Sequence, residues 1–292
     1  MGVEETIETV EQINRANALI RKERFLDAER IVDKLLRTIE PVEINKSGRV
    51  MDFSNNMEYY LYSHMNNKVA ISWSRNFLSD IYLLKGNILA ESRNFKEAIE
   101  YFDKALRWNP VSIRIYREIL VTCINLRDYN KFDTYFSRAV KIAMRPIDIA
   151  MLYKKLGYVW IERGEDEFAY NLILYSKLFF PKREADLKID FLQQRIGTRL
   201  KKYPDLGTIE YIKEKNLLYQ RPDYIVPTYN ALIKMMQDVM KKEEKQTRMN
   251  YLTLIDYYNG LYFHKPGGQI HSALLSLQRE YSIKFPDNKE EK

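Results

Sequence analysis

Two arginines form the clearest chemical pattern in the sequence. Arg114 and Arg117 lie three residues apart, so on a helix their guanidinium groups share one face. A guanidinium binds a carboxylate through two parallel hydrogen bonds and stays charged at physiological pH. The pair therefore favours binding of an acidic peptide or of the terminal carboxylate of a protein over reaction chemistry. An ordinary solvated helix face is the alternative interpretation.

Residue sets for catalysis or metal binding are missing from the sequence. The histidines His64, His264 and His271 never stand four apart, as a helical metal-binding pair requires. The single cysteine, Cys123, excludes an internal disulfide and is predicted to be a small buried hydrophobe. No nucleophile elbow, dinucleotide fingerprint or phosphate-binding glycine loop occurs. We therefore expect no enzymatic activity, no metal and no cofactor.

Composition predicts that helices position these residues. The 292 residues include only 10 Gly and 9 Pro, and 46% are hydrophobic. This length fits either two domains or one elongated array of repeats. No segment approaches the roughly 18 apolar residues of a membrane span, and the N-terminus lacks a secretory signal, so we expect a cytoplasmic protein. Residues 286–292 are predicted to be a disordered tail.

The charge distribution argues against nucleic acid as the main partner. The net charge is +7, but 47 basic residues are interleaved with 40 acidic ones. The one local basic excess lies between Lys182 and Lys202. It is interpreted as an exposed helix face, or else as a contact for an acidic or phosphate-bearing partner.

A repeated spacing of small residues and prolines organises the sequence. In residues 79–112, Gly86 is followed by Ala98 twelve residues later and by Pro110 twenty-four residues later. The same types recur at the same spacing in residues 150–183, at Gly157, Ala169 and Pro181. Small residues let two helices pack closely, and proline ends the second helix. The pattern predicts antiparallel helix pairs that stack on their neighbours.

Two weaker copies extend the predicted array. Residues 113–146 place Leu120 and Phe132 at the small positions, which predicts wider helix separation there. Residues 9–42 form an N-terminal degenerate pair. The insertion 43–78 is predicted to contain a loop and an aromatic helix, which either packs on the array or covers a groove.

The C-terminal third departs from the strict period. Residues 184–285 are predicted to be a diverged helical extension that caps the array. The Met-rich helix at residues 229–240 provides an alternative, a surface through which two copies dimerise.

These motifs resemble the tetratricopeptide repeat (TPR) family, most closely in residues 79–112 and 150–183, and the resemblance covers about half of the sequence. It implies an all-α, right-handed superhelix of antiparallel helix pairs. Its concave face, lined by the first helix of each pair, would bind a peptide or a partner helix. The family brings no catalytic residue.

The resemblance also places one set of side chains on the open side of the first helices. The set is basic with apolar patches, and we expect it to form a peptide-binding groove that favours an acidic peptide: Leu83, Asn87, Arg114, Arg117, Val121, Lys154, Lys155 and Tyr158. Some TPR domains bind a terminal carboxylate with a clamp of Lys, Asn and Arg. Here Asn87 and Lys154 match, but Leu83 replaces the first lysine, so the clamp is incomplete.

Three functional classes follow, in decreasing order of support. The first is a non-enzymatic adaptor or scaffold that binds a protein or peptide. The second is a self-assembling structural protein that dimerises through its C-terminal helices. The third is an RNA-binding or regulatory repeat protein, which the dispersed charge disfavours.

Overall fold

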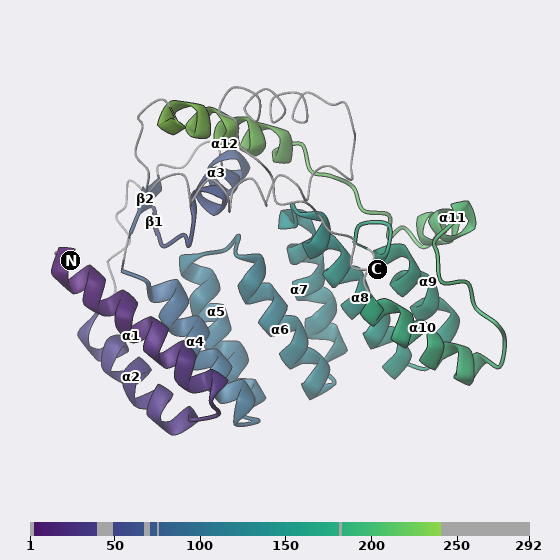
Figure 1. Cartoon of the computed structure of the whole chain (residues 1–292), viewed down its shortest axis with the longest axis horizontal. Coiled ribbons are helices and arrows are strands. Elements are labelled where there is room, and N and C mark those ends of the chain that lie inside the picture. Colours follow the sequence, from purple (N-terminus) through teal and green to yellow (C-terminus); the bar gives the residue numbers. More distant parts are fainter. Residues whose placement is uncertain (1–2, 40–48, 67–70, 75, 181–182, 241–292) are drawn as a thin grey trace.

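Antiparallel helix pairs make up most of the part of the protein that the structure describes, as the sequence spacing predicts (Figure 1). The computed structural model describes residues 3–39, 49–66, 71–74, 76–180 and 183–240. Four pairs stack in sequence order, and each helix also packs on the next pair. The pairs are α1 (Val3–Arg21) with α2 (Phe25–Thr38), α4 (Leu78–Glu91) with α5 (Phe95–Trp108), α6 (Ile113–Leu126) with α7 (Tyr129–Ile142), and α8 (Pro146–Glu162) with α9 (Asp166–Ser176).

The same turn closes the first helix of all four pairs. One residue in each turn has a positive φ, namely Glu23, Arg93, Arg127 and Gly164. The N–H of the following residue donates to the carbonyl oxygen five residues earlier: Arg24 to Leu19, Asn94 to Leu89, Asp128 to Cys123 and Glu165 to Trp160. A left-handed residue with this hydrogen bond is a Schellman motif. The two weaker copies at 9–42 and 113–146 therefore share the geometry of the strong ones.

Two glycines allow helices to approach more closely than any side chain would permit. A Cβ atom on Gly86 would lie 2.4 Å from Cε1 of Phe102, whose ring is fully buried. A Cβ atom on Gly157 would lie 2.6 Å from Cγ1 of Ile173. The pairs α4/α5 and α8/α9 stay close along their length, whereas α6 and α7 do so over a shorter stretch. This confirms the wider separation predicted from Leu120 and Phe132.

The first two pairs stack directly although residues 43–78 separate them in sequence. Helix α2 packs on α4, and buried Lys85 of α4 reaches across this contact. Its Nζ lies 2.8 Å from Oε1 of Glu29 and 2.6 Å from Oδ1 of Asp33. Burial opposes the charge on Lys85, but the hydrogen bonds that Lys85 donates to both carboxylates raise its pKa. The inserted segment must therefore leave and rejoin the array at one edge.

The insertion folds against the edge where one pair passes to the next. Strands β1 (Arg49–Met51) and β2 (Ile71–Trp73) pair in parallel on either side of α3 (Asn56–Met65). The Asp52 N–H donates to the Trp108 carbonyl at 2.9 Å, at the end of α5. Phe53 stacks edge-on against Tyr59 and Trp73. The aromatic residues of the predicted helix therefore serve packing.

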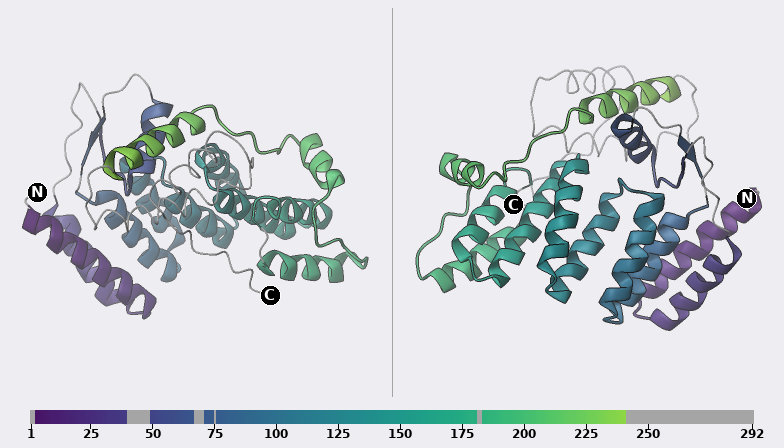
Figure 2. Two further views of the ribbon diagram at one scale, coloured as in Figure 1. Left: turned by 45° about the horizontal axis from the view of Figure 1, so that its top comes forward. Right: turned by 180° about the vertical axis from the view of Figure 1, so that it is seen from behind.

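The C-terminal helices take three different positions. Helices α10 (Arg183–Ile196) and α11 (Leu206–Glu214) both pack on α9, whereas α12 (Ile225–Met240) crosses back and packs on α3. Figure 1 and the right view of Figure 2 show α12 above α3, at the same edge of the array as the insertion. Three tyrosine hydroxyls donate to backbone carbonyls and hold the returning segment: Tyr153 to Leu217, Tyr219 to Ala143 and Tyr224 to Lys141.

One part of the surface of helix α12 is buried within the molecule. Ile225, Thr228 and Leu232 are buried. The dimerisation hypothesis for residues 229–240 stays a prediction. The predicted tail 286–292, the end of the predicted extension 184–285, and both His264 and His271 lie outside the described residues. Among the helices that the structure describes, none is long and apolar enough to cross a membrane.

The Gly86 contact predicts a large effect of a single methyl group. Gly86→Ala is expected to lower the free energy of unfolding by about 1–3 kcal/mol, because the Phe102 ring must move from a packed position. Gly207→Ala is the control, since its Cβ would meet only Oδ1 of Asp205 at 3.4 Å. Chemical denaturation measures both. A loss no larger in Gly86→Ala than in the control would show that α4 and α5 tolerate a wider spacing.

Candidate peptide-binding site

The first helices pack on one another along the array. Helix α1 contacts α4, α4 contacts α6, and α6 contacts α8. These helices therefore line the inner side of the stack, where the sequence places the candidate residues. Arg117 of α6 and the adjacent Lys154 and Lys155 of α8 lie close enough to repel one another.

Lys155 is the most unusual charge of this group. The pKa of Lys155 is lowered to about 8, and burial is the largest cause. The positive charges of Lys154 and Arg117 also lower this pKa, whereas the negative charge of Glu118 raises it. Lys155 forms no ion pair in the part of the protein that the structure describes. Glu118 and Glu184 attract this half-buried ammonium without forming an ion pair with it, so the position favours an added anion.

The neighbouring residues of α8 face α10. The Nζ atom of Lys154 lies 2.5 Å from Oε2 of Glu184. The Tyr158 hydroxyl is buried without a hydrogen bond of acceptable geometry, and burial together with nearby Glu184 raises its pKa. Lys188 Nζ lies 5.0 Å from the centre of the Tyr158 ring. One cation of α10, Lys188, thus lies beside this part of α8.

A cleft opens where α6 and α8 meet the insertion, and we name it the α6–α8 cleft. Its volume is about 300 Å³. Three arginines and three methionines that line it are Arg114, Arg117, Arg145, Met57, Met144 and Met151. Arg114 and Arg117, paired by spacing in the sequence, therefore do line one cavity.

The three arginines of the cleft differ in how firmly they are held. Arg145 makes two hydrogen bonds to Asp148, at 2.7 and 2.8 Å. Arg114 pairs with Asp80 at 3.1 Å. Among the residues that the structure describes, Arg117 pairs only with its neighbour in sequence, Glu118, at 2.8 Å, and its side chain is 48% exposed. Such a surface pair contributes about 0–1 kcal/mol, so Arg117 is the arginine most able to change partner.

Buried carboxyl groups fix the insertion beside the cleft. Glu58 accepts hydrogen bonds from Asn109 Nδ2 at 2.7 Å and from the Ser54 N–H at 2.8 Å. Burial raises the pKa of Glu58, and these hydrogen bonds only partly oppose it. Asp52 accepts from the Ser79 N–H at 3.1 Å, and burial raises its pKa to about 7. The insertion, which forms one side of the cleft, is therefore held by two carboxyl groups whose neutral form is favoured by burial.

One predicted groove residue is not on an open surface. Leu83 is only 1% exposed and belongs to the same core as Met51, Phe53 and Leu61 of the insertion. Its expected exposure is wrong because it joins this core, and Asp52 of the insertion contacts Ser79 one turn earlier on α4. Asn87 and Val121 are half-buried and are not among the residues that line the α6–α8 cleft.

Sequence reasoning missed the residues that come from connections between helices. Met57 and Glu58 belong to the insertion, and Arg145 directly precedes Pro146 at the start of α8. One signal was present, because Asn55 and Glu58 have the spacing of a helix N-cap. The Glu58 N–H indeed donates to Asn55 Oδ1 at 3.1 Å. No sequence signal indicated that this helix would dock beside α6.

Part of the basic run from Lys182 to Lys202 is neutralised within the molecule. Arg195 pairs with Asp166 at 3.0 Å, Lys201 with Asp205 at 2.6 Å and Lys202 with Asp190 at 2.7 Å. These pairs support the interpretation as a solvated surface. Cys123 is a free, fully buried cysteine, as predicted, and burial raises its pKa to about 12.

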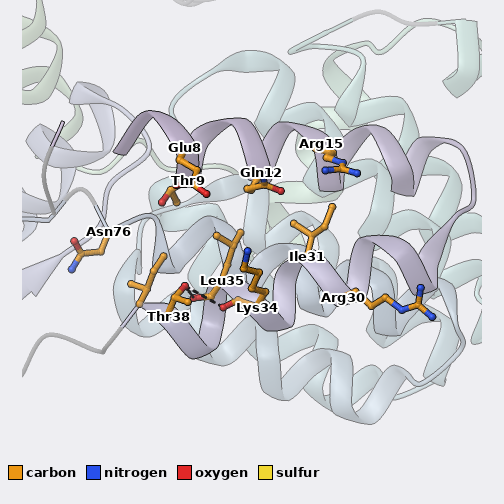
Figure 3. Close-up of a pocket in the computed structure, with 11 residues that line it drawn as sticks. Glu8, Thr9, Gln12, Arg15, Arg30, Ile31, Lys34, Leu35, Thr38 and Asn76 are labelled. Atoms are coloured by element: carbon orange, nitrogen blue, oxygen red, sulfur yellow. Dashed lines mark hydrogen bonds between the residues drawn. The ribbon is translucent and has the colours of Figure 1, made fainter. Parts of the chain in front are cut away.

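A larger cavity of about 670 Å³ lies between α1 and α2 (Figure 3). In this view Arg15 of α1 and Arg30 of α2 stand apart, and Arg30 extends away from the other residues. The Thr38 hydroxyl is engaged with the carbonyls of Lys34 and Leu35, both at 3.1 Å. The polar groups that line this cavity do not point toward one common spot, so the cavity is a weaker candidate for a binding site than the α6–α8 cleft.

The stacked pairs define a helical-repeat protein. The model of the tetratricopeptide repeat family matches residues 79–112, which are α4 and α5 with their flanking residues. The protein is thus a TPR-containing protein. Comparison with curated proteins finds no match. The family generally binds proteins or peptides and is generally non-enzymatic.

The buried acid of the insertion predicts a pH-dependent stability. The pKa of Glu58 is higher in the folded protein than in the unfolded protein. The contribution of Glu58 to stability therefore falls as the pH rises above its pKa in the unfolded protein. Glu58→Gln keeps the size and removes the charge. We expect it to be more stable than wild type at pH 8 by on the order of 1 kcal/mol, with the difference vanishing near pH 4.

Thermal unfolding of both proteins across this pH range tests the expectation. The control is Glu91→Gln, at an exposed carboxylate near the end of α4. A variant that loses stability at pH 8 would show that an ionised Glu58 holds the insertion.

Proposed function

We propose that this protein is a non-enzymatic, cytoplasmic adaptor or scaffold that binds an acidic peptide segment of another protein. The inner surface at α6 and α8 is the proposed contact, and Arg114, Arg117, Lys154, Lys155 and Tyr158 are its main residues. The family match to residues 79–112 supports protein binding in general. The preference for acidic ligands is our inference from the charges.

Lys155 carries the proposal. Its ammonium is desolvated, lies beside two other cations, and forms no ion pair within the described residues, although Glu118 and Glu184 attract it more weakly than an ion pair would. A protein that needed only stability would favour an apolar side chain here. A peptide carboxylate would supply the missing partner and would also replace Glu118 at exposed Arg117.

The proposal predicts opposite effects of one substitution on stability and on binding. Lys155→Met should raise the free energy of unfolding at pH 7 by about 1–2 kcal/mol, because an apolar group avoids the desolvation of the charge. It should also weaken binding of a fluorescein-labelled acidic peptide about tenfold, measured by anisotropy. The control is Lys131→Met, at an exposed lysine of α7. Unchanged affinity in Lys155→Met would refute the assigned role.

Charge reversal tests the same surface with native partners. The variant Arg114→Glu/Arg117→Glu/Lys154→Glu should capture none of the proteins that wild type retains from a cell extract. Circular dichroism must first show equal folding, because Arg114 and Lys154 pair with Asp80 and Glu184. Equal capture by both proteins would remove the inner surface from consideration and direct attention to the C-terminal helices, where the dimer alternative lies.

A further inference from the structure

The α6–α8 cleft combines an apolar floor with a charged mouth. Met144 is buried, whereas Met57 of α3 and Met151 of α8 are half-buried. Ile113 and Ile142 complete the apolar lining. Methionine side chains adapt their shape to what they contact, so such a lining accepts several bulky apolar groups.

The charge at the mouth is positive. Asp148 forms an ion pair with Arg145. Burial favours the neutral form of Glu58, so neither acid leaves an unpaired negative charge in the cleft. Arg117 is exposed and holds only a weak pair with Glu118. A ligand that places an apolar side chain in the cleft therefore meets an available guanidinium beside it.

The volume limits the size of what enters. At about 300 Å³, the cleft lies at the lower end of the range of roughly 300–1,000 Å³ that small-ligand pockets occupy. A single large side chain fits this volume better than an extended molecule does. Because one wall belongs to α3, the insertion contributes directly to the contact.

We propose that the α6–α8 cleft is a specificity pocket for one bulky apolar side chain, such as leucine, methionine or phenylalanine, flanked by acidic residues in the bound peptide. This deepens the proposed acidic-peptide function and rests on it. The apolar side chain packs between Met57 and Met151, and a neighbouring carboxylate pairs with Arg117. The insertion thus selects among acidic peptides that the inner surface alone would bind alike.

Two labelled synthetic peptides test the pocket on the full-length protein, Glu-Asp-Glu-Leu-Glu-Asp-Glu and the same sequence with a central glycine. Wild type should bind the leucine peptide about tenfold more tightly by fluorescence anisotropy, since burying most of a leucine side chain has this effect. Met57→Glu should remove the preference, so that both peptides bind alike, and its added charge should weaken the binding of both acidic peptides. Met65→Glu is the matched control, because Met65 lies on the same helix, is 37% exposed and does not line the cleft.

The outcomes separate this inference from the function on which it rests. Equal binding of both peptides by wild type would overturn the pocket and leave the acidic-peptide function standing. Binding of neither peptide would overturn both. Loss of the preference in Met65→Glu as well would assign the effect to the fold of α3 and overturn the direct contact with Met57. Circular dichroism on each variant excludes unfolding as the cause.

Discussion

The contact between Gly86 and Phe102 sets the spacing on which the array depends. The backbone of α4 accepts the ring at a distance that no side chain would allow. Gly157 and Ile173 repeat the contact two pairs later. Where Leu120 and Phe132 replace the small residues, the helices approach closely over less of their length. That looser pair is the one whose first helix, α6, carries Arg114 and Arg117.

The insertion turns a regular stack into a specific surface. It docks at the edge through Asp52 and Glu58, and it shares a core with Leu83, which a regular array would expose. The same docking places Met57 opposite α8 and so creates the α6–α8 cleft. The docking of the insertion thus has two results: Leu83 is buried, and one side of the α6–α8 cleft is formed.

Helix α12 adds a second layer over the insertion. It returns from the far end of the array, held by hydroxyls of Tyr219 and Tyr224 on the carbonyls of Ala143 and Lys141. Thr228 is fully buried where α12 meets α3, and its Oγ1 lies 3.5 Å from His64 Nδ1. The segment predicted as an end cap therefore supports the wall of the proposed pocket.

The sequence by itself determined the helix pairs, their turns and the close contacts. Small residues and prolines at fixed spacing act within 34 residues, as in the unit 79–112, so they can be read locally. It also predicted that Arg114 and Arg117 share a face, because three-residue spacing on a helix is local as well. Only the tertiary structure decided that Leu83 is buried, that Lys155 forms no ion pair among the described residues, and that Met57 meets the cleft. Each of these depends on docking between segments far apart in the sequence, and the apolar and acidic residues responsible have no spacing that indicates their partners.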